Sequence, residues 1–147
     1  MGRSLMLAAI WLALTGVAQA QMQDLSGAAQ DWVNAVRKQA KRGTLTPSEP
    51  LTRAAAAHAR DLAQSGTFSH SGSDGSGVGQ RVRRQGYGYC FVAENLAKGQ
   101  GALAEVLQGW MGSKGHKRNM LANEAEDFAL VRGPGNLWVM VLGRSGC

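Results

Sequence analysis

Two imidazoles and one carboxylate are the side chains of this chain best suited to acid–base or metal chemistry, and they come from three separate segments. His70 opens a loop rich in serine and glycine, Glu94 is followed by Asn95, and His116 follows Ser113 at a spacing of three residues. A carboxylate next to an imidazole can act as a general base or as a pair of metal ligands. We therefore expect the fold to gather these groups in one shared cavity.

Glu94 lies among apolar residues, between Val92-Ala93 and Leu96-Ala97. A carboxylate buried there without a partner would be strongly destabilising or would become protonated, so Glu94 needs a partner. His70 or His116 could be that partner. Two alternatives remain open: Glu94 accepts backbone N–H bonds and organises its own turn, or His70 only caps the preceding helix and holds its loop in place.

The Ser113 and His116 pair could bring a hydroxyl next to an imidazole, as in a serine hydrolase. A serine nucleophile also needs an oxyanion hole, and the sequence indicates none. Capping of the following helical turn is the better explanation of Ser113. His58 lies on the apolar side of an alanine-rich segment, where a histidine is typically a core residue; it becomes a further candidate if it faces the same cavity as His70.

Residues 1–20 have the pattern of a cleavable signal peptide. Arg3 supplies the positive charge, residues 5–17 form an apolar run, and Ala18-Gln19-Ala20 is a typical cleavage site. The apolar run is short for a membrane span, and no later segment is apolar enough to be one. We therefore expect an exported chain, periplasmic or extracellular, without a transmembrane segment after cleavage.

The remaining residues, 21–147, are enough for a single domain. Cys90 and Cys147 are expected to form a disulfide, because two thiols in an oxidising compartment normally pair; the alternative is two free buried cysteines. The net charge is +6, and many of the cations lie in three clusters. These clusters could favour an anionic envelope surface or acidic glycans. A solvated helix face is the stronger interpretation. The export signal and the absence of an aromatic-interleaved basic motif argue against nucleic acid. The clusters are Arg37, Lys38, Lys41 and Arg42; Arg81, Arg83 and Arg84; and Lys114, Lys117 and Arg118.

Hydrophobic periodicity predicts four helices, over residues 25–42, 51–65, 80–85 and 103–113. Trp32 is expected to anchor the first helix in the core, with Arg37 on its polar face. Residues 44–50 are expected to be a connecting loop and residues 65–79 an exposed loop. Gly115 is expected to end the fourth helix in a left-handed conformation.

Three segments have strand character. Residues 87–92 are predicted to be extended, and residues 128–131 and 137–142 are predicted to form a hairpin across Gly133-Pro134-Gly135-Asn136. Helices that precede and separate these strands predict an α+β domain.

The order of the motifs SH, GSDG, R…GY, AEN and W..S.GH over residues 51–143 resembles the bacterial branch of the CAP superfamily, the SCP-like domains of cysteine-rich secretory proteins, antigen 5 and pathogenesis-related 1. The resemblance implies a three-layer α-β-α sandwich with a central antiparallel sheet. It also implies that His70 lines a central cavity.

The sequence departs from the eukaryotic members, which carry two histidines and two acids in that cavity. His70 matches the first histidine and Glu94 the first acid, but the second acid falls near Ser113, and no histidine occurs near residues 136–138. His116 belongs instead to the bacterial GH motif. A divalent metal such as zinc, with His70 and Glu94 as ligands, is therefore weakly supported, since zinc usually has at least three protein ligands.

Three functions fit these observations. The preferred one is a secreted binding module with a cleft lined by His70, Glu94 and His116 for a lipid, a glycan or an envelope protein. The second is a hydrolase, protease-like or metal-assisted, with His70 as base and Glu94 orienting it. The third is a purely structural envelope domain.

Overall fold

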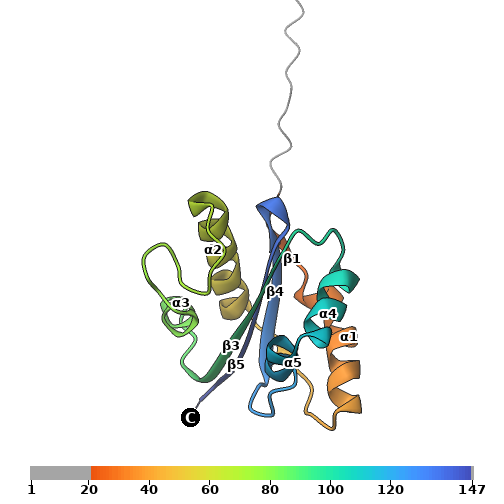
Figure 1. Ribbon diagram of the computed structural model, residues 1–147. Coiled ribbons are helices and arrows are strands. Elements are labelled where there is room, and N and C mark those ends of the chain that lie inside the picture. Colours follow the sequence, from red (N-terminus) through yellow and green to blue (C-terminus); the bar gives the residue numbers. More distant parts are fainter. Residues whose placement is uncertain (1–20, 147) are drawn as a thin grey trace, which may run out of the picture.

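A five-stranded sheet lies between two helical layers in the computed structural model, which describes residues 21–146 (Figure 1). One layer holds α2 and α3, and the other holds α1, α4 and α5. This architecture confirms the expected α-β-α sandwich. The elements in chain order are β1 (Gln23–Asp24), α1 (Ser26–Gln39), β2 (Thr46–Pro47), α2 (Glu49–Ser65), α3 (Val78–Arg84), β3 (Tyr89–Lys98), α4 (Leu103–Gly112), α5 (Lys114–Met120), β4 (Asp127–Gly133), the 3₁₀ turn η1 (Pro134–Asn136) and β5 (Leu137–Ser145).

The strands follow the order β1-β4-β5-β3, and β2 pairs with β4 off this path. The hairpin between β4 and β5 is confirmed, and its turn contains Gly135 and Asn136 with positive φ angles of 69° and 53°. Glycine and asparagine tolerate this left-handed conformation better than other residues. Strand β3 pairs with β5 and forms one edge of the sheet.

Both faces of the sheet are buried, because neighbouring residues of each strand point to opposite layers. Phe128 and Leu130 of β4 pack against α1, α4 and α5. Ala129 and Val131, their neighbours in the chain, pack against α2 and α3. Burial on both faces explains the nearly continuous apolar sequence of β4 and β5.

Helix α1 corrects two expectations about single residues. Trp32 is only partly buried, and the residues that α1 buries most completely are Ala29, Val33 and Arg37. Arg37 was expected on the polar face, yet it is fully buried and donates hydrogen bonds to backbone carbonyls of a distant segment. A long cationic side chain can be buried when such acceptors surround it.

The ends of several elements also differ from the expectations. Strand β3 continues through Glu94 and Asn95 instead of ending before them. The predicted left-handed cap at Gly115 is wrong, because Gly115 lies inside helix α5, which begins directly after Ser113. The expected loop over residues 44–50 contains the short strand β2, whose residues pair with β4.

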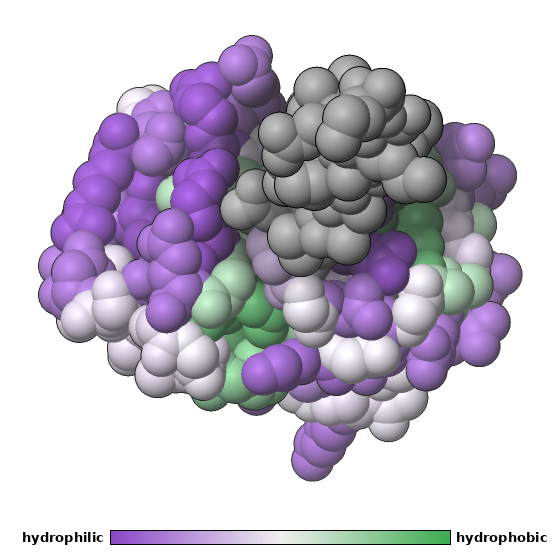
Figure 2. Space-filling model, turned by 90° about the horizontal axis from the view of Figure 1, so that it is seen from above, coloured by the Kyte–Doolittle hydropathy of each residue, from purple (hydrophilic) through white to green (hydrophobic). Residues whose placement is uncertain are grey.

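Among residues 21–146, no helix combines the length and apolar character needed to cross a membrane. Seen from the end that holds the β4–β5 hairpin, most of the visible surface is hydrophilic and hydrophobic residues form smaller areas within it (Figure 2). The predicted signal peptide and Cys147 lie outside the described residues, so the leader and the bridge to Cys90 stay predictions.

Candidate functional site

Strand β3 distributes the AEN motif between the two sides of the sheet. Glu94 pairs with Val141, whose side chain belongs to the core under α2 and α3, whereas Asn95 pairs with Met140, which belongs to the opposite core. The two-residue period of a strand therefore points Glu94 towards α2 and α3 and points Asn95 towards α4 and α5. The candidate site is built around this edge strand.

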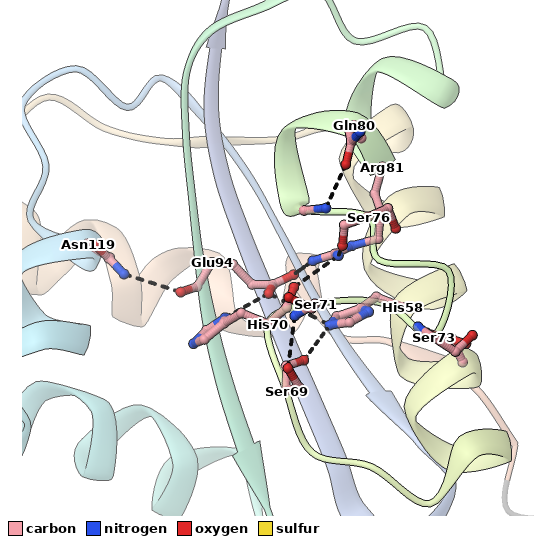
Figure 3. A network of polar contacts seen from close by, with 12 residues as sticks. His58, Ser69, His70, Ser71, Ser73, Ser76, Gln80, Arg81, Glu94 and Asn119 are labelled. Atoms are coloured by element: carbon pink, nitrogen blue, oxygen red, sulfur yellow. Dashed lines mark hydrogen bonds and ion pairs between the residues drawn. The ribbon is translucent and has the colours of Figure 1, made fainter.

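Glu94 is the centre of the polar cluster on the first side (Figure 3). Its side chain is 3 % exposed, and its Oε1 lies 2.8 Å from Nδ1 of His70. Because an ionised carboxylate only accepts hydrogen bonds, Nδ1 of His70 carries the proton in this contact. His70 therefore turns its other nitrogen, Nε2, away from Glu94, and its side chain is 63 % exposed. The expected contact between His70 and Glu94 is observed, but neither residue lines either of the two pockets described below, so the shared cavity expected for them is not.

Arg81 binds the second oxygen of Glu94. Its Nη2 donates to Oε2 at 2.7 Å, and its Nη1 donates to the carbonyls of His70 at 3.0 Å and Ser76 at 2.6 Å. One guanidinium thus neutralises the buried carboxylate and also binds two carbonyls of the loop, those of His70 and Ser76. The alternative in which Glu94 accepts backbone N–H bonds is not observed, because both oxygens bind side chains.

His58 lies beneath His70 on α2 and is almost completely buried. Its Nε2 donates to the carbonyl of Ser69 at 3.0 Å and lies 3.8 Å from Oε1 of Glu94, too far for a hydrogen bond. Burial lowers the pKa of His58, an effect that Glu94 opposes and Arg81 adds to. The ring is therefore neutral, and its buried Nδ1, an acceptor, has no hydrogen-bond partner among the described residues.

On the other side of β3, Asn95 and Asn119 connect the strand to α5. The side-chain amide of Asn95 donates to the carbonyl of His116 at 3.1 Å. That of Asn119 donates to Oδ1 of Asn95 at 2.9 Å and to the carbonyl of Glu94 at 3.2 Å. These bonds fix the position of His116, whose ring lies 6.3 Å from that of Trp110.

His116 is not a partner of Glu94, which corrects one of the two pairings considered from the sequence. It is close enough to His70 for the two rings to influence each other. The pKa of His116 is lowered, first by burial and then by the neighbouring charge of His70. The two candidate histidines thus lie near each other, one contributed by each helical layer.

A groove of about 390 Å³ opens beside His116, whereas His70 and Glu94 are not among its lining residues. Its walls come from β3, from α4 with the start of α5, and from the loop that follows α2. Phe68 is 49 % exposed, and no other large hydrophobic residue among residues 21–146 is exposed. The lining residues are Phe68, Leu96, Ala97, Lys98, Gln100, Val106, Gly109, Trp110, Ser113 and His116.

Ser113 lines this groove but does not cap α5. It occupies the position before the helix, yet its side chain makes no capping hydrogen bond, so the expected role is wrong. Within residues 21–146, no serine hydroxyl is hydrogen-bonded to Nε2 of His70 or to His116. The geometry therefore does not support a serine-histidine nucleophile.

A second, smaller pocket of about 230 Å³ lies between α2 and α3. His58 and Arg81 contribute to its wall, together with the polar residues Asp61, Asp74 and Arg84. Asp61 and Asp74 accept hydrogen bonds from the serines of the loop, and these bonds lower the pKa of both carboxyls. The loop is thereby held against α2 and α3.

The residues present do not fit a zinc ion. Among residues 21–146, no three His, Cys, Asp or Glu side chains are grouped so that they could hold a metal. His70 and Arg81 already occupy both oxygens of Glu94, and the guanidinium would repel a cation at that position. The expected zinc site at His70 and Glu94 therefore lacks a third ligand, and the positive charge of Arg81 disfavours a cation there.

Sequence reasoning missed the role of Arg81. The residue was placed in a basic cluster with Arg83 and Arg84, although only Arg81 is buried. The sequence did contain a signal for the buried position of Arg81: it begins the R…GY motif and lies on a short helix that leads into β3. A buried acid needs a partner of opposite charge, and Arg81 belongs to the cluster of cations that precedes Glu94 on a different element.

The comparisons with known proteins agree with this fold. Residues 30–136 match the model of the CAP family, described as the cysteine-rich secretory protein family. The uncharacterized protein YkwD of Bacillus subtilis is 32 % identical over 88 residues, which are 60 % of this chain and 34 % of that protein. The chain thus spans about a third of the length of this curated relative.

Solved bacterial structures share the fold at low sequence identity. An extracellular protein containing an SCP domain from Bacillus anthracis has a TM-score of 0.76 and 23 % identity, over 81 % of this chain and 40 % of that one. An outer surface protein from Borrelia burgdorferi has a TM-score of 0.76 and 19 % identity, over 87 % of this chain and 100 % of that one. The matched residues, the α-β-α sandwich and the polar cluster around the AEN motif together establish that this chain belongs to the CAP family.

Proposed function

We propose that this domain is an exported binding module whose groove holds a small, partly apolar ligand, a lipid or glycan of the cell envelope. The apolar part of the ligand would lie against Leu96, Val106 and Trp110. Its polar group would lie at the end of the groove marked by His116, with His70 next to it. The extracellular and outer-surface proteins that share the fold support the exported location.

One observation carries this proposal: the groups around Glu94 and Asn95 are held by hydrogen bonds, while the groove beside them is open. Both oxygens of Glu94 are bound, Asn119 donates to Asn95 and to the carbonyl of Glu94, and Asn95 donates to the carbonyl of His116. Such a network holds surrounding groups rigid, which favours binding because little order must be lost when a ligand arrives. The groove volume of about 390 Å³ is in the range of small-molecule sites.

Gly109 provides a direct test, because it lines the groove and a Cβ at this position would meet no atom within 4 Å. Leucine in its place would fill the groove and favour the helix, so stability should not fall. Binding of a fluorescent fatty-acid probe should weaken at least tenfold in Gly109→Leu. Gly112→Leu, on the same helix and also free of close contacts, is the matched control and should bind like the wild type. Equal binding by both variants, or no binding by the wild type, would refute the groove as the site.

A second candidate function, hydrolysis, is favoured by the orientation of His70. Its Nδ1 is fixed by a carboxylate and its Nε2 is exposed, which is the arrangement of a general base that activates water. If the domain hydrolyses an envelope peptide or glycan, His70→Ala should abolish turnover while leaving the free energy of unfolding nearly unchanged. Turnover retained in the folded variant would exclude His70 as the base.

We also propose that the mature chain carries a Cys90–Cys147 bridge. The predicted leader and the two cysteines support it. The bridge would close a long loop, so it would add about 3–4 kcal/mol of stability on chain-entropy grounds. The intact mass of the exported protein, before and after reduction, should differ by two hydrogens. Two free thiols in the unreduced protein would refute the bridge.

A further inference from the structure

We infer that the rim of the groove docks on an anionic lipid bilayer, with Phe68 entering the membrane and cations of β3 and α5 contacting lipid phosphates. This docking surface consists of Phe68, Lys98, Lys114, Lys117 and Arg118. The inference goes beyond the proposed function and does not depend on a ligand in the groove. It rests on exposure, charge and placement.

Phe68 is the first observation. It lies in the loop after α2, at the mouth of the groove, and half of its side chain is exposed although the rest of the aromatic residues among residues 21–146 are more buried. An exposed aromatic ring beside an apolar groove is unfavourable in water and favourable at a membrane interface. The ring is therefore placed where it could enter the acyl boundary of a bilayer.

The second observation is a group of cations without acidic partners. Lys98, Lys114, Lys117 and Arg118 are all exposed, and none of them forms an ion pair with a described residue. Arg53 and Arg84, in the opposite helical layer, are paired with acids. The docking surface therefore keeps its positive charge available for an anionic partner.

Phe68 and Lys98 line the same groove, and the cations of α5 belong to a helix that contributes His116 to its wall. Lys98 lines it directly, and Ser113 and His116, which also line it, immediately precede Lys114 and Lys117. Figure 1 shows α5 and α4 beside the edge strand β3, with the loop after α2 on the other side of that strand. Helices α4 and α5 together contain one acidic residue, Glu105, and three cations, so these two helices have a net positive charge.

The combination favours a bilayer over a soluble polyanion. The cations alone would suit any polyanion, since they need only phosphate, carboxylate or sulfate groups. The exposed ring of Phe68 favours in addition an apolar phase, which a bilayer supplies directly beneath its phosphates. Each cation near an anionic membrane strengthens binding about fivefold.

Sedimentation with vesicles tests the inference. The mature protein should sediment with vesicles of phosphatidylglycerol and phosphatidylcholine, and much less with phosphatidylcholine alone, and added salt should weaken the binding. Lys114→Glu/Lys117→Glu should lower the partition coefficient by at least about tenfold. Lys38→Glu/Lys41→Glu has the same spacing and charge change at the end of α1, which contributes no residue to the groove, and should lower it much less.

Phe68→Ser should weaken vesicle binding several-fold and leave binding of a soluble polyanion such as dextran sulfate unchanged. Equal losses from both lysine pairs, or binding to dextran sulfate without binding to vesicles, would overturn the inference. Gly109→Leu keeps all residues of the docking surface, so it should bind vesicles normally even though its groove is filled. Failure of the groove proposal and failure of the docking proposal are therefore distinguishable.

Discussion

Arg81 and Glu94 form a buried ion pair in which Nη2 lies 2.7 Å from Oε2, with side chains only 7 % and 3 % exposed. The same guanidinium binds the carbonyls of His70 and Ser76. Helix α3, the histidine loop and strand β3 therefore meet at one side chain. The position of His70 depends on this pair as much as on its own contact with Glu94.

Replacing Arg81 should be strongly destabilising. Arg81→Met would leave the buried carboxylate of Glu94 with only His70, and breaking a buried pair on one side typically costs about 3–5 kcal/mol. Lysine could keep the charge but not the forked contacts, so Arg81→Lys should recover only part of this loss. Urea unfolding measures both. Arg83→Met, at an exposed position on the same helix, is the control, and an equal small loss in all three variants would contradict the structural role of Arg81.

His70 and Glu94 should respond differently to removal although they contact each other. The side chain of His70 is 63 % exposed, so His70→Ala should lower the free energy of unfolding by at most about 1 kcal/mol. Glu94→Gln would leave Arg81 buried without a counter-charge and should cost several times more. Thermal and urea unfolding of the two variants should separate these effects. A larger loss from His70→Ala than from Glu94→Gln would contradict the geometry described for the site.

Arg37 should be essential for joining α1 to the segment after α5. Its guanidinium donates to the carbonyls of Gly43, Met120, Ala122 and Ala125 at 2.7–3.2 Å, without an acidic partner among the described residues. Burial lowers the pKa of Arg37, and the nearby charge of Arg42 adds to this. Each buried carbonyl left without a donor costs about 1–3 kcal/mol, so Arg37→Met should destabilise by at least that amount. Lys38→Met, at the exposed neighbouring position, should be nearly neutral in the same unfolding measurement.

Stability should fall as the pH drops below about 6.5, partly because of His58. Burial lowers the pKa of His58 in the folded protein, with Arg81 adding to the effect and Glu94 and Asp61 opposing it. Below about pH 6.5, the unfolded chain therefore binds a proton at His58 that the folded chain does not bind. The contribution of neutral His58 to the free energy of unfolding is lost as the pH falls towards its folded pKa. The pKa of His116 is also lowered, so both histidines act in the same direction.

Urea unfolding between about pH 7.5 and about pH 5 measures this slope. His58→Gln keeps a donor for the carbonyl of Ser69 but cannot titrate, so its stability should depend less on pH than that of the wild type. The difference between the two proteins should shrink as the pH falls. Parallel pH profiles would show that His58 titrates equally in the folded and unfolded states.

The sequence was sufficient to predict the sandwich and the contact between His70 and Glu94. The hairpin of β4 and β5 is encoded locally, by two apolar runs and a turn rich in glycine. The acid in an apolar context implied a partner, and the family resemblance indicated which histidine lies nearby. These features depend on local patterns or on motifs that occur in a recognisable order.

Arg37 and Arg81 could not be predicted in this way. Each looks like a solvated cation in its own helix, and each is buried because a distant segment supplies acceptors: the carbonyls around Met120 for Arg37 and the carboxylate of Glu94 for Arg81. Gly115 was misjudged for a related reason. Its helix α5 is held by contacts of Asn119 with β3, which local propensity does not reveal.

The binding role itself is tested most directly by what the protein retains after purification from its own cell envelope. Organic extracts of the wild type, of Gly109→Leu and of Gly112→Leu should be compared by mass spectrometry at equal protein concentration. A binding module should yield one partly apolar compound in near-stoichiometric amount from the wild type and Gly112→Leu, and little or none from Gly109→Leu. Extracts that contain no such compound, or the same amount from all three proteins, would contradict a ligand in the groove.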